Sequence, residues 1–196
     1  MSYLKKEMIS EMIRDMMSFE SKLKEVYDLH GLEFRDNTGR RNAILSQAQE
    51  KFLSDAINRN GEISFVDGRT GHPDIIVESQ CRELECKLTS GSGGSWSLQT
   101  DYSTISKKTK LDYIYVLANK DFDKFSVLFF EGLTKDDFHL PAPGSREKSR
   151  MNKASAMRKC TVFMGDVSVK NEKMSRQYVS QLESLIVEAT EKINDI

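Results

Sequence analysis

Two short runs between residues 74 and 88 combine the apolar alternation of β-strands with ionisable side chains. Asp74 opens the first run, IIV, and Glu85 and Lys87 lie within the second, LECKL. Side chains alternate between the two faces of a strand. We therefore expect the second strand to present a charged face and an apolar, core-directed face: Glu83, Glu85 and Lys87 on the first, and Leu84, Cys86 and Leu88 on the second.

A hairpin centred between Ser79 and Gln80 would place Asp74 directly opposite Glu85, with Cβ atoms about 4.5–5.5 Å apart. This register is assumed, because Ser-Gln is not a strong turn signal. Opposed carboxylates repel each other, whereas Mg²⁺ favours carboxylate, water and phosphate oxygens. The spacing thus predicts a metal site for phosphodiester hydrolysis, in which Lys87 orients the attacking water or neutralises the transition state. The alternative is a salt-bridge ladder on a solvated sheet face.

Hydrophobic periodicity indicates the elements that position these residues. One helix is expected over about 3–28, a second over about 42–57, and a third from about residue 172 onward. The Met-rich first helix either packs in the core or contributes to a dimer surface. Strands are expected in four further segments: ISFV, LDYIYVLAN, FSVLFFEGL and CTVFMGDVSV. The fold class is therefore predicted as α/β, one domain over 1–196 with a central mixed sheet of five or six strands flanked by helices.

Composition excludes several classes of protein. The chain has 196 residues, of which 38% are hydrophobic and 30% charged, and its formal net charge is −1. Any nucleic-acid surface must therefore be a local basic patch. The three cysteines lack CxxC spacing, which argues against a thiolate zinc cluster and suits a reducing cytoplasm. We expect no membrane partner, because no segment has the roughly 18 to 20 apolar residues that span a bilayer. We expect no secretion signal, because the N-terminus MSYLKKEMISEM has acidic residues in its first turns and no apolar core.

Pro73-Asp74, followed eleven residues later by Glu85-Cys86-Lys87, resembles the PD…(D/E)xK signature of the restriction-endonuclease-like nucleases. The resemblance implies the fold of that family. It also implies that Asp74, Glu85 and the backbone carbonyl of Cys86 bind Mg²⁺, and that Lys87 is the catalytic lysine. A helix glutamate joins the metal site in some members, so Glu50 is a further candidate ligand; the alternative is an exposed helix residue.

The order of several segments is similar to that in the PvuII-like type II restriction enzymes, which are small homodimers. The segments are HGLEFRDNTGR, a helix, GRTGHPD, ELECKLT, DYIYVL and FEGLTKDDF. The resemblance implies that Asp36 and Asn37 form a turn that approaches DNA. A histidine-rich stretch that reads bases in such enzymes is replaced here by SWSLQTDYS, so the cleavage chemistry carries over better than the recognised sequence.

Two further segments are candidates for DNA contact. The stretch after the catalytic strand offers side chains that can read base edges in the major groove or anchor the loop: Trp96, Gln99, Asp101, Tyr102 and Ser103. A basic segment after Pro143 is expected to contact phosphates through Arg146, Lys148, Arg150 and Lys153. For both segments the alternative is a solvated polar loop.

The predicted function is that of a Mg²⁺-dependent, site-specific double-stranded DNA endonuclease acting as a homodimer. A dimer places two sites on opposite strands of a pseudo-palindromic target. The alternatives are a structure-specific or repair nuclease of the same fold and a non-catalytic DNA-binding module.

Overall fold

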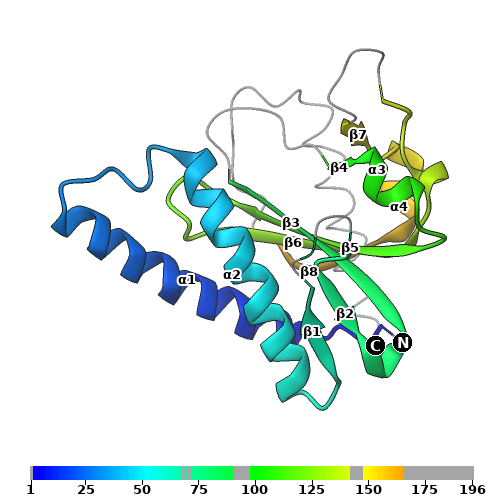
Figure 1. Ribbon diagram of the computed structural model, residues 1–196, viewed down its shortest axis with the longest axis horizontal. Helices are drawn as coiled ribbons and strands as arrows, with labels where there is room; N and C mark the ends of the chain where they lie inside the picture. Colours follow the sequence, from blue (N-terminus) through cyan, green and yellow to red (C-terminus); the bar gives the residue numbers. More distant parts are fainter. Residues whose placement is uncertain (1, 68, 70–71, 91–97, 142–147, 166–196) are drawn as a thin grey trace.

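The fold is built on a six-stranded mixed sheet (Figure 1). The computed structural model describes residues 2–67, 69, 72–90, 98–141 and 148–165. In sheet order the strands are β1 (Ser64–Val66), β2 (Ile75–Val77), β3 (Arg82–Ser90), β5 (Leu111–Ala118), β6 (Phe125–Leu133) and β8 (Cys160–Gly165). Neighbouring strands are antiparallel except β3 and β5, which run parallel. The predicted α/β class and mixed sheet of five or six strands are confirmed. The helix predicted from about residue 172 lies outside the described residues.

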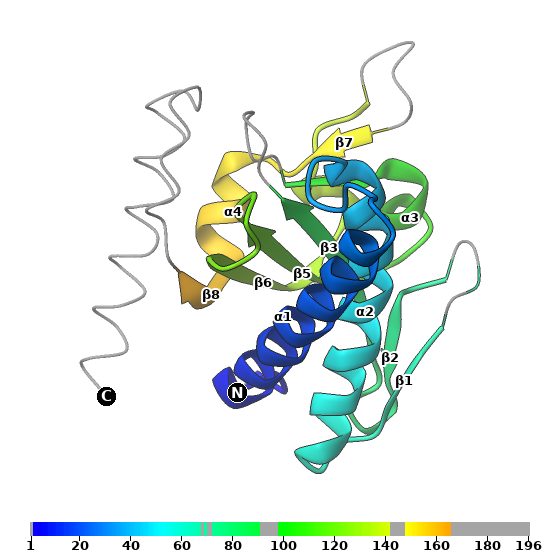
Figure 2. The same ribbon diagram turned by 90° about the vertical axis from the view of Figure 1, so that its left-hand side faces the viewer.

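Two long helices, α1 (Lys6–Leu29) and α2 (Thr38–Arg59), pack against one face of the sheet (Figures 1 and 2). The Met-rich face of α1 is buried in this core through Met8, Ile9, Met12, Ile13 and Met16. Of the two interpretations of this face, core packing therefore holds, and the same face cannot also bind a second chain. None of the helices in the described ranges is both long and apolar enough to cross a bilayer.

The opposite face of the sheet carries smaller elements around a second core. They are α3 (Tyr102–Ser106), α4 (Lys153–Lys159) and a two-stranded antiparallel sheet of β4 (Gln99–Asp101) and β7 (Lys148–Arg150). Every residue of β5 is buried, because this strand has a core on each of its faces. Successive residues such as Ile114 and Tyr115 enter different cores, so the strand reads as a continuous apolar run from residue 113 to residue 118.

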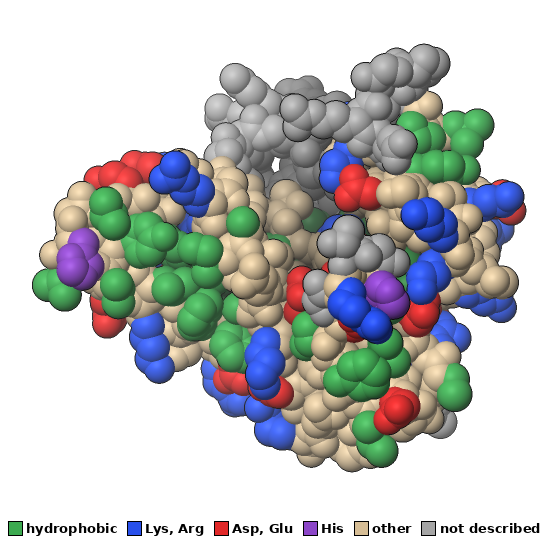
Figure 3. All heavy atoms as spheres, viewed as in Figure 1, with side chains coloured by type: hydrophobic (Ala, Val, Ile, Leu, Met, Phe, Trp, Pro, Cys, Tyr) green, Lys and Arg blue, Asp and Glu red, His purple; other side chains and the backbone are tan. Residues whose placement is uncertain are grey.

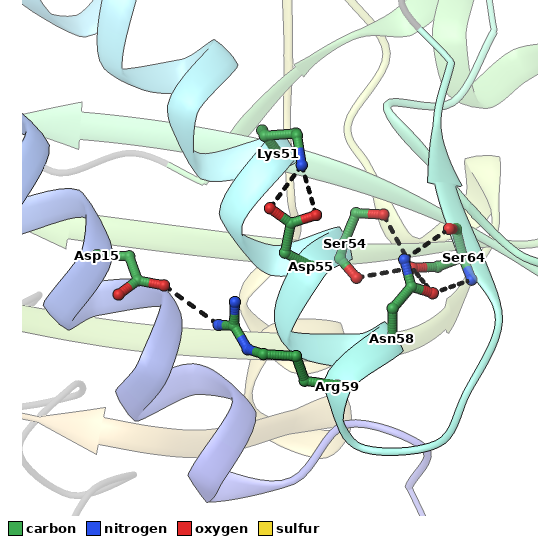
Figure 4. A network of polar contacts seen from close by, with 7 residues as sticks. All are labelled: Asp15, Lys51, Ser54, Asp55, Asn58, Arg59 and Ser64. Carbon is green, nitrogen blue, oxygen red and sulfur yellow. Dashed lines mark hydrogen bonds and ion pairs between the residues drawn. The ribbon is translucent and has the colours of Figure 1, made fainter.

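Polar contacts hold the C-terminal half of α2 against its neighbours (Figure 4). The guanidinium of Arg59 contacts Asp15 of α1 at 3.2 Å and Glu11 at 2.9 Å. On the other side, the amide of Asn58 donates to the Ser64 carbonyl at 3.0 Å and accepts from the Ser64 amide at 2.7 Å. These contacts fix α2 between α1 and β1, so that the helix also packs against β3, the strand with the ExK residues.

One predicted boundary was wrong, and two short elements were not predicted. The second helix begins at Thr38 and not near residue 42, because the Asn37 side chain caps it by accepting a hydrogen bond from the Arg40 amide at 3.0 Å. In the basic segment after Pro143, for which the alternative was a solvated polar loop, residues 148–150 form β7 and residues 153–159 form α4. Both elements are shorter than the window in which a hydrophobic period becomes visible.

Candidate active site

Strands β2 and β3 pair in the register that the sequence predicted. The paired residues are Ile75 with Leu84, Ile76 with Glu83 and Val77 with Arg82. Continuing by one place sets Asp74 opposite Glu85. The reversal is a 3₁₀ turn, Glu78–Gln80, followed by Cys81 in the left-handed region with φ of 50°. The chain thus makes a tight connection without the Gly or Asn that usually signals one.

The ladder between β2 and β3 ends at the pair of Ile75 and Leu84, and Pro73 would lie opposite Cys86 if the register continued. Proline has no N–H to donate. Pro73 therefore has no N–H to offer the Cys86 carbonyl, while the Cys86 amide donates a hydrogen bond to Oδ2 of the Asp74 carboxylate at 2.7 Å. The N–H and C=O of one strand residue point toward the same neighbouring strand. The Cys86 carbonyl is therefore directed toward the space beside Asp74.

Glu85 is a buried carboxylate with only one of its oxygens bonded. The residue is 5% exposed, and its Oε1 accepts a hydrogen bond from the Lys87 ammonium. Its Oε2 is buried with no hydrogen-bond partner among the described residues. Buried polar atoms in native proteins are nearly always bonded, so an orphaned carboxylate oxygen fits a ligand that supplies positive charge. A hard cation meets that requirement.

Three carboxylates around this point are held above their ordinary pKa. Burial raises the pKa of Glu85 to about 6, which Lys87 opposes and the Asp74 charge reinforces. Burial also raises the pKa of Asp74. Glu50 lies on α2, and burial together with the charges of Asp74 and Glu85 raises its pKa to about 7. Burial lowers the pKa of Lys87, but the neighbouring Glu85 and Asp74 outweigh it and the net shift is upward. The lysine therefore stays protonated.

Glu50, Asp74 and Glu85 line a cleft of about 790 Å³, to which Asp67, Arg69 and residues of α3 also contribute. In the view of Figure 3, basic and acidic side chains and a histidine lie close together to the right of the centre. Among the described lining residues, five are carboxylates and two are permanent cations, Arg69 and Lys107; the carboxylates are Glu50, Asp67, Asp74, Glu85 and Asp101. Such a cleft repels a phosphodiester unless a cation is bound.

The described residues contain no group of three or more His, Cys, Asp or Glu side chains already gathered around one point for a metal. Asp74 and Glu85 are instead turned toward the Cys86 amide and Lys87. Mg²⁺ does not need three protein carboxylates, because it keeps several waters and commonly binds through one or two carboxylates plus phosphate oxygens. Asp74 and Glu85, with the Cys86 carbonyl and Glu50, form a donor set of that kind.

The Asp36-Asn37 turn lies away from this cleft. Asp36 pairs with Lys120 at 3.1 Å, and Asn37 caps α2. Both residues line a second cavity of about 510 Å³ at the junction of α1 and α2. The structure therefore places the turn at a separate surface from Asp74 and Glu85.

The two remaining candidate DNA segments are joined in one small sheet, which the sequence did not predict. Gln99 pairs with Arg150 and Asp101 pairs with Lys148, whose ammonium contacts the Asp101 carboxylate at 2.8 Å. The inner face is buried, and Thr100 there contacts the Tyr113 hydroxyl at 3.1 Å. The outer face thus presents Gln99, Asp101, Lys148 and Arg150 together beside the cleft.

Other predicted residues of these segments have different positions. Asp101 and Ser103 line the cleft, and Tyr102 packs on the second core. Lys153 is exposed at the start of α4. Trp96 and Arg146 lie outside the described residues. The sequence interpretation missed Asp67 and Arg69, which also line the cleft. The only signal was the turn DGRTGHPD, which was interpreted through its glycines and proline.

No protein-family model matches this chain. A comparison with curated proteins also returns no match.

Proposed function

We propose that the chain is a Mg²⁺-dependent endonuclease that hydrolyses phosphodiester bonds in double-stranded DNA. The observation that carries this proposal is the buried Glu85 carboxylate, which lines an acidic cleft, has an orphaned oxygen and has a lysine beside it. The mixed sheet flanked by helices is compatible with the restriction-endonuclease-like fold. We propose that the chain has this fold.

Asp74 and Glu85 would hold the cation, with the Cys86 carbonyl as a third donor and Glu50 on the opposite wall of the cleft. A bound Mg²⁺ supplies Lewis-acid stabilisation of phosphate charge and a bound water of lowered pKa. The three raised carboxyl pKa values support this assignment, because a divalent cation relieves the unfavourable charge that burial and mutual repulsion impose.

Lys87 would act on the reacting phosphate. Its side chain is 28% exposed, and its ammonium is held by Glu85. Lys87 follows Glu85 by two residues on β3, so both side chains are on the same face of the strand. An ammonium has three donors. After one of them binds Glu85, two remain to orient an attacking water or to stabilise the charge that develops on the phosphate. Both roles require the lysine to be protonated, as its raised pKa favours.

The outer face of the β4–β7 sheet is our candidate for contact with the bases. Arginine pairs bidentately with guanine and glutamine with adenine in the major groove, which admits a two-stranded ribbon. Gln99 and Arg150 are directly paired and so would face neighbouring base edges. Lys148 is partly neutralised by Asp101, so its expected role is orientation of the ribbon more than phosphate binding. Cutting both strands of a palindromic site requires two such clefts, and so a homodimer.

The test is digestion of a plasmid of known sequence with Mg²⁺, followed by sequencing of the ends. Discrete fragments with one common terminal sequence support a site-specific endonuclease. A smear or random nicks would indicate a nuclease that does not read sequence. Metal-independent binding of duplex without cleavage, in protein whose fold is verified, would indicate a non-catalytic DNA-binding module and overturn the proposal.

A further inference from the structure

The segment between β1 and β2 contains an ion pair that the metal site does not use. The Asp67 carboxylate is 5% exposed and accepts two hydrogen bonds from the guanidinium of Arg69, from Nε at 2.7 Å and from Nη2 at 2.6 Å. The backbone amide of Arg69 donates to the same carboxylate at 3.3 Å. These bonds keep the pKa of Asp67 well below its ordinary value, with the Arg69 guanidinium as the main cause. Asp67 is therefore a permanent anion that fixes the orientation of the arginine.

Asp67 also connects this arginine to the rest of the cleft, through its carboxylate and through its backbone amide. His72 Nδ1 lies 3.2 Å from Asp67, and the Asp67 amide donates to the Asp74 carbonyl at 3.0 Å. The second bond joins the arginine's anchor directly to the backbone of a proposed metal ligand. Arg69, His72 and Asp74 all line the same cleft. The position of the Arg69 guanidinium relative to Asp74 is thus set through one buried residue.

Arg69 keeps donors that Asp67 does not use. A guanidinium has five N–H donors, and two of its nitrogens engage the carboxylate here. The side chain is 71% exposed, so the remaining donors face solvent at the mouth of the cleft. A fork of this kind matches the two free oxygens of a phosphodiester. If the only role of Arg69 were to neutralise Asp67, a lysine would serve equally well. The variant Arg69→Lys therefore distinguishes charge neutralisation from phosphate binding.

We propose that Arg69, oriented by Asp67, binds a backbone phosphate of the DNA strand that enters the cleft, next to the phosphate that is cut. This inference rests on the proposed function. It names Arg69 as a substrate-binding residue and Asp67 as a positioning residue. Since the cleft is otherwise rich in carboxylates, a fixed guanidinium at its mouth gives the anionic backbone a defined place to bind.

The first experiment separates an effect of charge from an effect of orientation, because the two change the affinity for DNA in opposite directions. Asp67→Asn removes a negative charge from the cleft, so electrostatics alone predicts tighter DNA binding. Loss of orientation predicts the opposite: weaker binding and a higher KM, by about tenfold, as for one lost charge-assisted hydrogen bond. Binding is measured in the Glu85→Gln background so that the DNA stays intact, and circular dichroism checks the fold. Tighter binding by Asp67→Asn would overturn the positioning role.

The second experiment identifies the phosphate and does not depend on Asp67. Wild type, Arg69→Lys and Arg69→Gln are assayed on duplexes in which single phosphates are replaced, one at a time, by a neutral methylphosphonate. We expect one position near the cut at which the methylphosphonate lowers the kcat/KM of wild type by about tenfold. At that position it should not lower the kcat/KM of Arg69→Gln, which already lacks the contact. In Arg69→Lys the methylphosphonate should also cause little of this drop in kcat/KM. Lysine keeps the charge of arginine, but it lacks the fork of donors that binds the phosphate.

Arg59→Gln is the matched control, since Arg59 is also an exposed arginine paired with carboxylates, on the α1–α2 side of the molecule. It should behave as wild type on every duplex. If wild type cuts DNA and Arg69→Gln shows the same methylphosphonate profile, the phosphate site is wrong while the proposed function stands. If wild type neither cuts nor binds duplex, the proposed function itself fails.

Discussion

The Asp74 carboxylate and the Cys86 amide are joined by a hydrogen bond of 2.7 Å across the end of the β2–β3 pair. The carboxylate accepts the hydrogen bond that the Cys86 amide would give to a backbone carbonyl if the ladder continued, and this bond holds the carboxylate opposite Glu85. A side chain that continues a ladder in this way has little freedom to rotate. The first carboxylate of the site is therefore fixed before any ligand binds, which lowers the entropy lost on binding.

Without metal, the stability of the fold should decrease as the pH rises from about 5 to 8. The pKa of Glu85 is about 6 and that of Glu50 about 7 in the folded chain, against an ordinary value of 4.5. The folded state therefore binds more protons than the unfolded state in this range, and the free energy of unfolding falls with rising pH. Each pKa unit of difference contributes about 1.4 kcal/mol. Urea unfolding in EDTA at four pH values measures the slope.

Millimolar Mg²⁺ should remove most of this decrease. Glu50→Gln should flatten the EDTA curve and raise stability at pH 8, whereas Glu25→Gln, at an exposed position on α1, should leave the curve unchanged. A wild-type stability that rises between pH 5 and 8 would contradict the buried carboxylate cluster.

Glu85→Gln should abolish cleavage, with a rate at least a thousandfold lower, because the neutral amide cannot balance the charge of a divalent cation. Glu83→Gln is the matched control. Glu83 lies on the same strand face, two residues away, and pairs with Lys108 at 2.8 Å. It should cut at the wild-type rate within about threefold. Initial rates on a duplex with the mapped site decide the question, and equal losses in both variants would argue for a general effect of charge on the strand.

Gln99→Ala and Arg150→Ala should each relax discrimination at one base pair of the recognised site. One bidentate contact distinguishes bases by about 1–3 kcal/mol. The two affected positions should be adjacent or nearly so, because the residues are directly paired in β4–β7. Cleavage of a duplex series with each position varied gives the result. A uniform slowing on all duplexes would mean that the ribbon contacts only the backbone.

Arg41→Met should leave the free energy of unfolding unchanged or raise it. Arg41 is fully buried, donates one hydrogen bond to the Lys120 carbonyl, and stacks on Phe122 at 5.6 Å. Its Nε and Nη2 have no partner among the described residues, and burial lowers its pKa. Methionine fills a similar space without an incompletely bonded charge. Arg41→Ala is the contrast and should lose about 2–4 kcal/mol through the cavity. A comparable loss in Arg41→Met would show that the charge itself stabilises the fold.

The charged hairpin was predictable because its signal is local. Alternation along LECKL fixed its two faces, and apolar content identified β5 and β6. The partnership of β4 with β7 was not predictable, since each strand has three residues and a single buried position. Asp67 was missed for a related reason. Its importance comes from burial and from the three hydrogen bonds that Arg69 donates to one carboxylate, and neither property is visible in a turn sequence.

The β4–β7 pairing has a consequence for how the molecule folds and opens. Its strands are far apart in the chain, and the entropy of closing such a loop must be overcome by only three residue pairs. The small sheet can therefore form only after the large one has brought its ends together, and it should open first in the native state. Its amides should exchange with solvent much faster than those of the nine-residue β3. The surface that we propose for base reading could therefore change in evolution without disturbing the strand that carries Glu85 and Lys87.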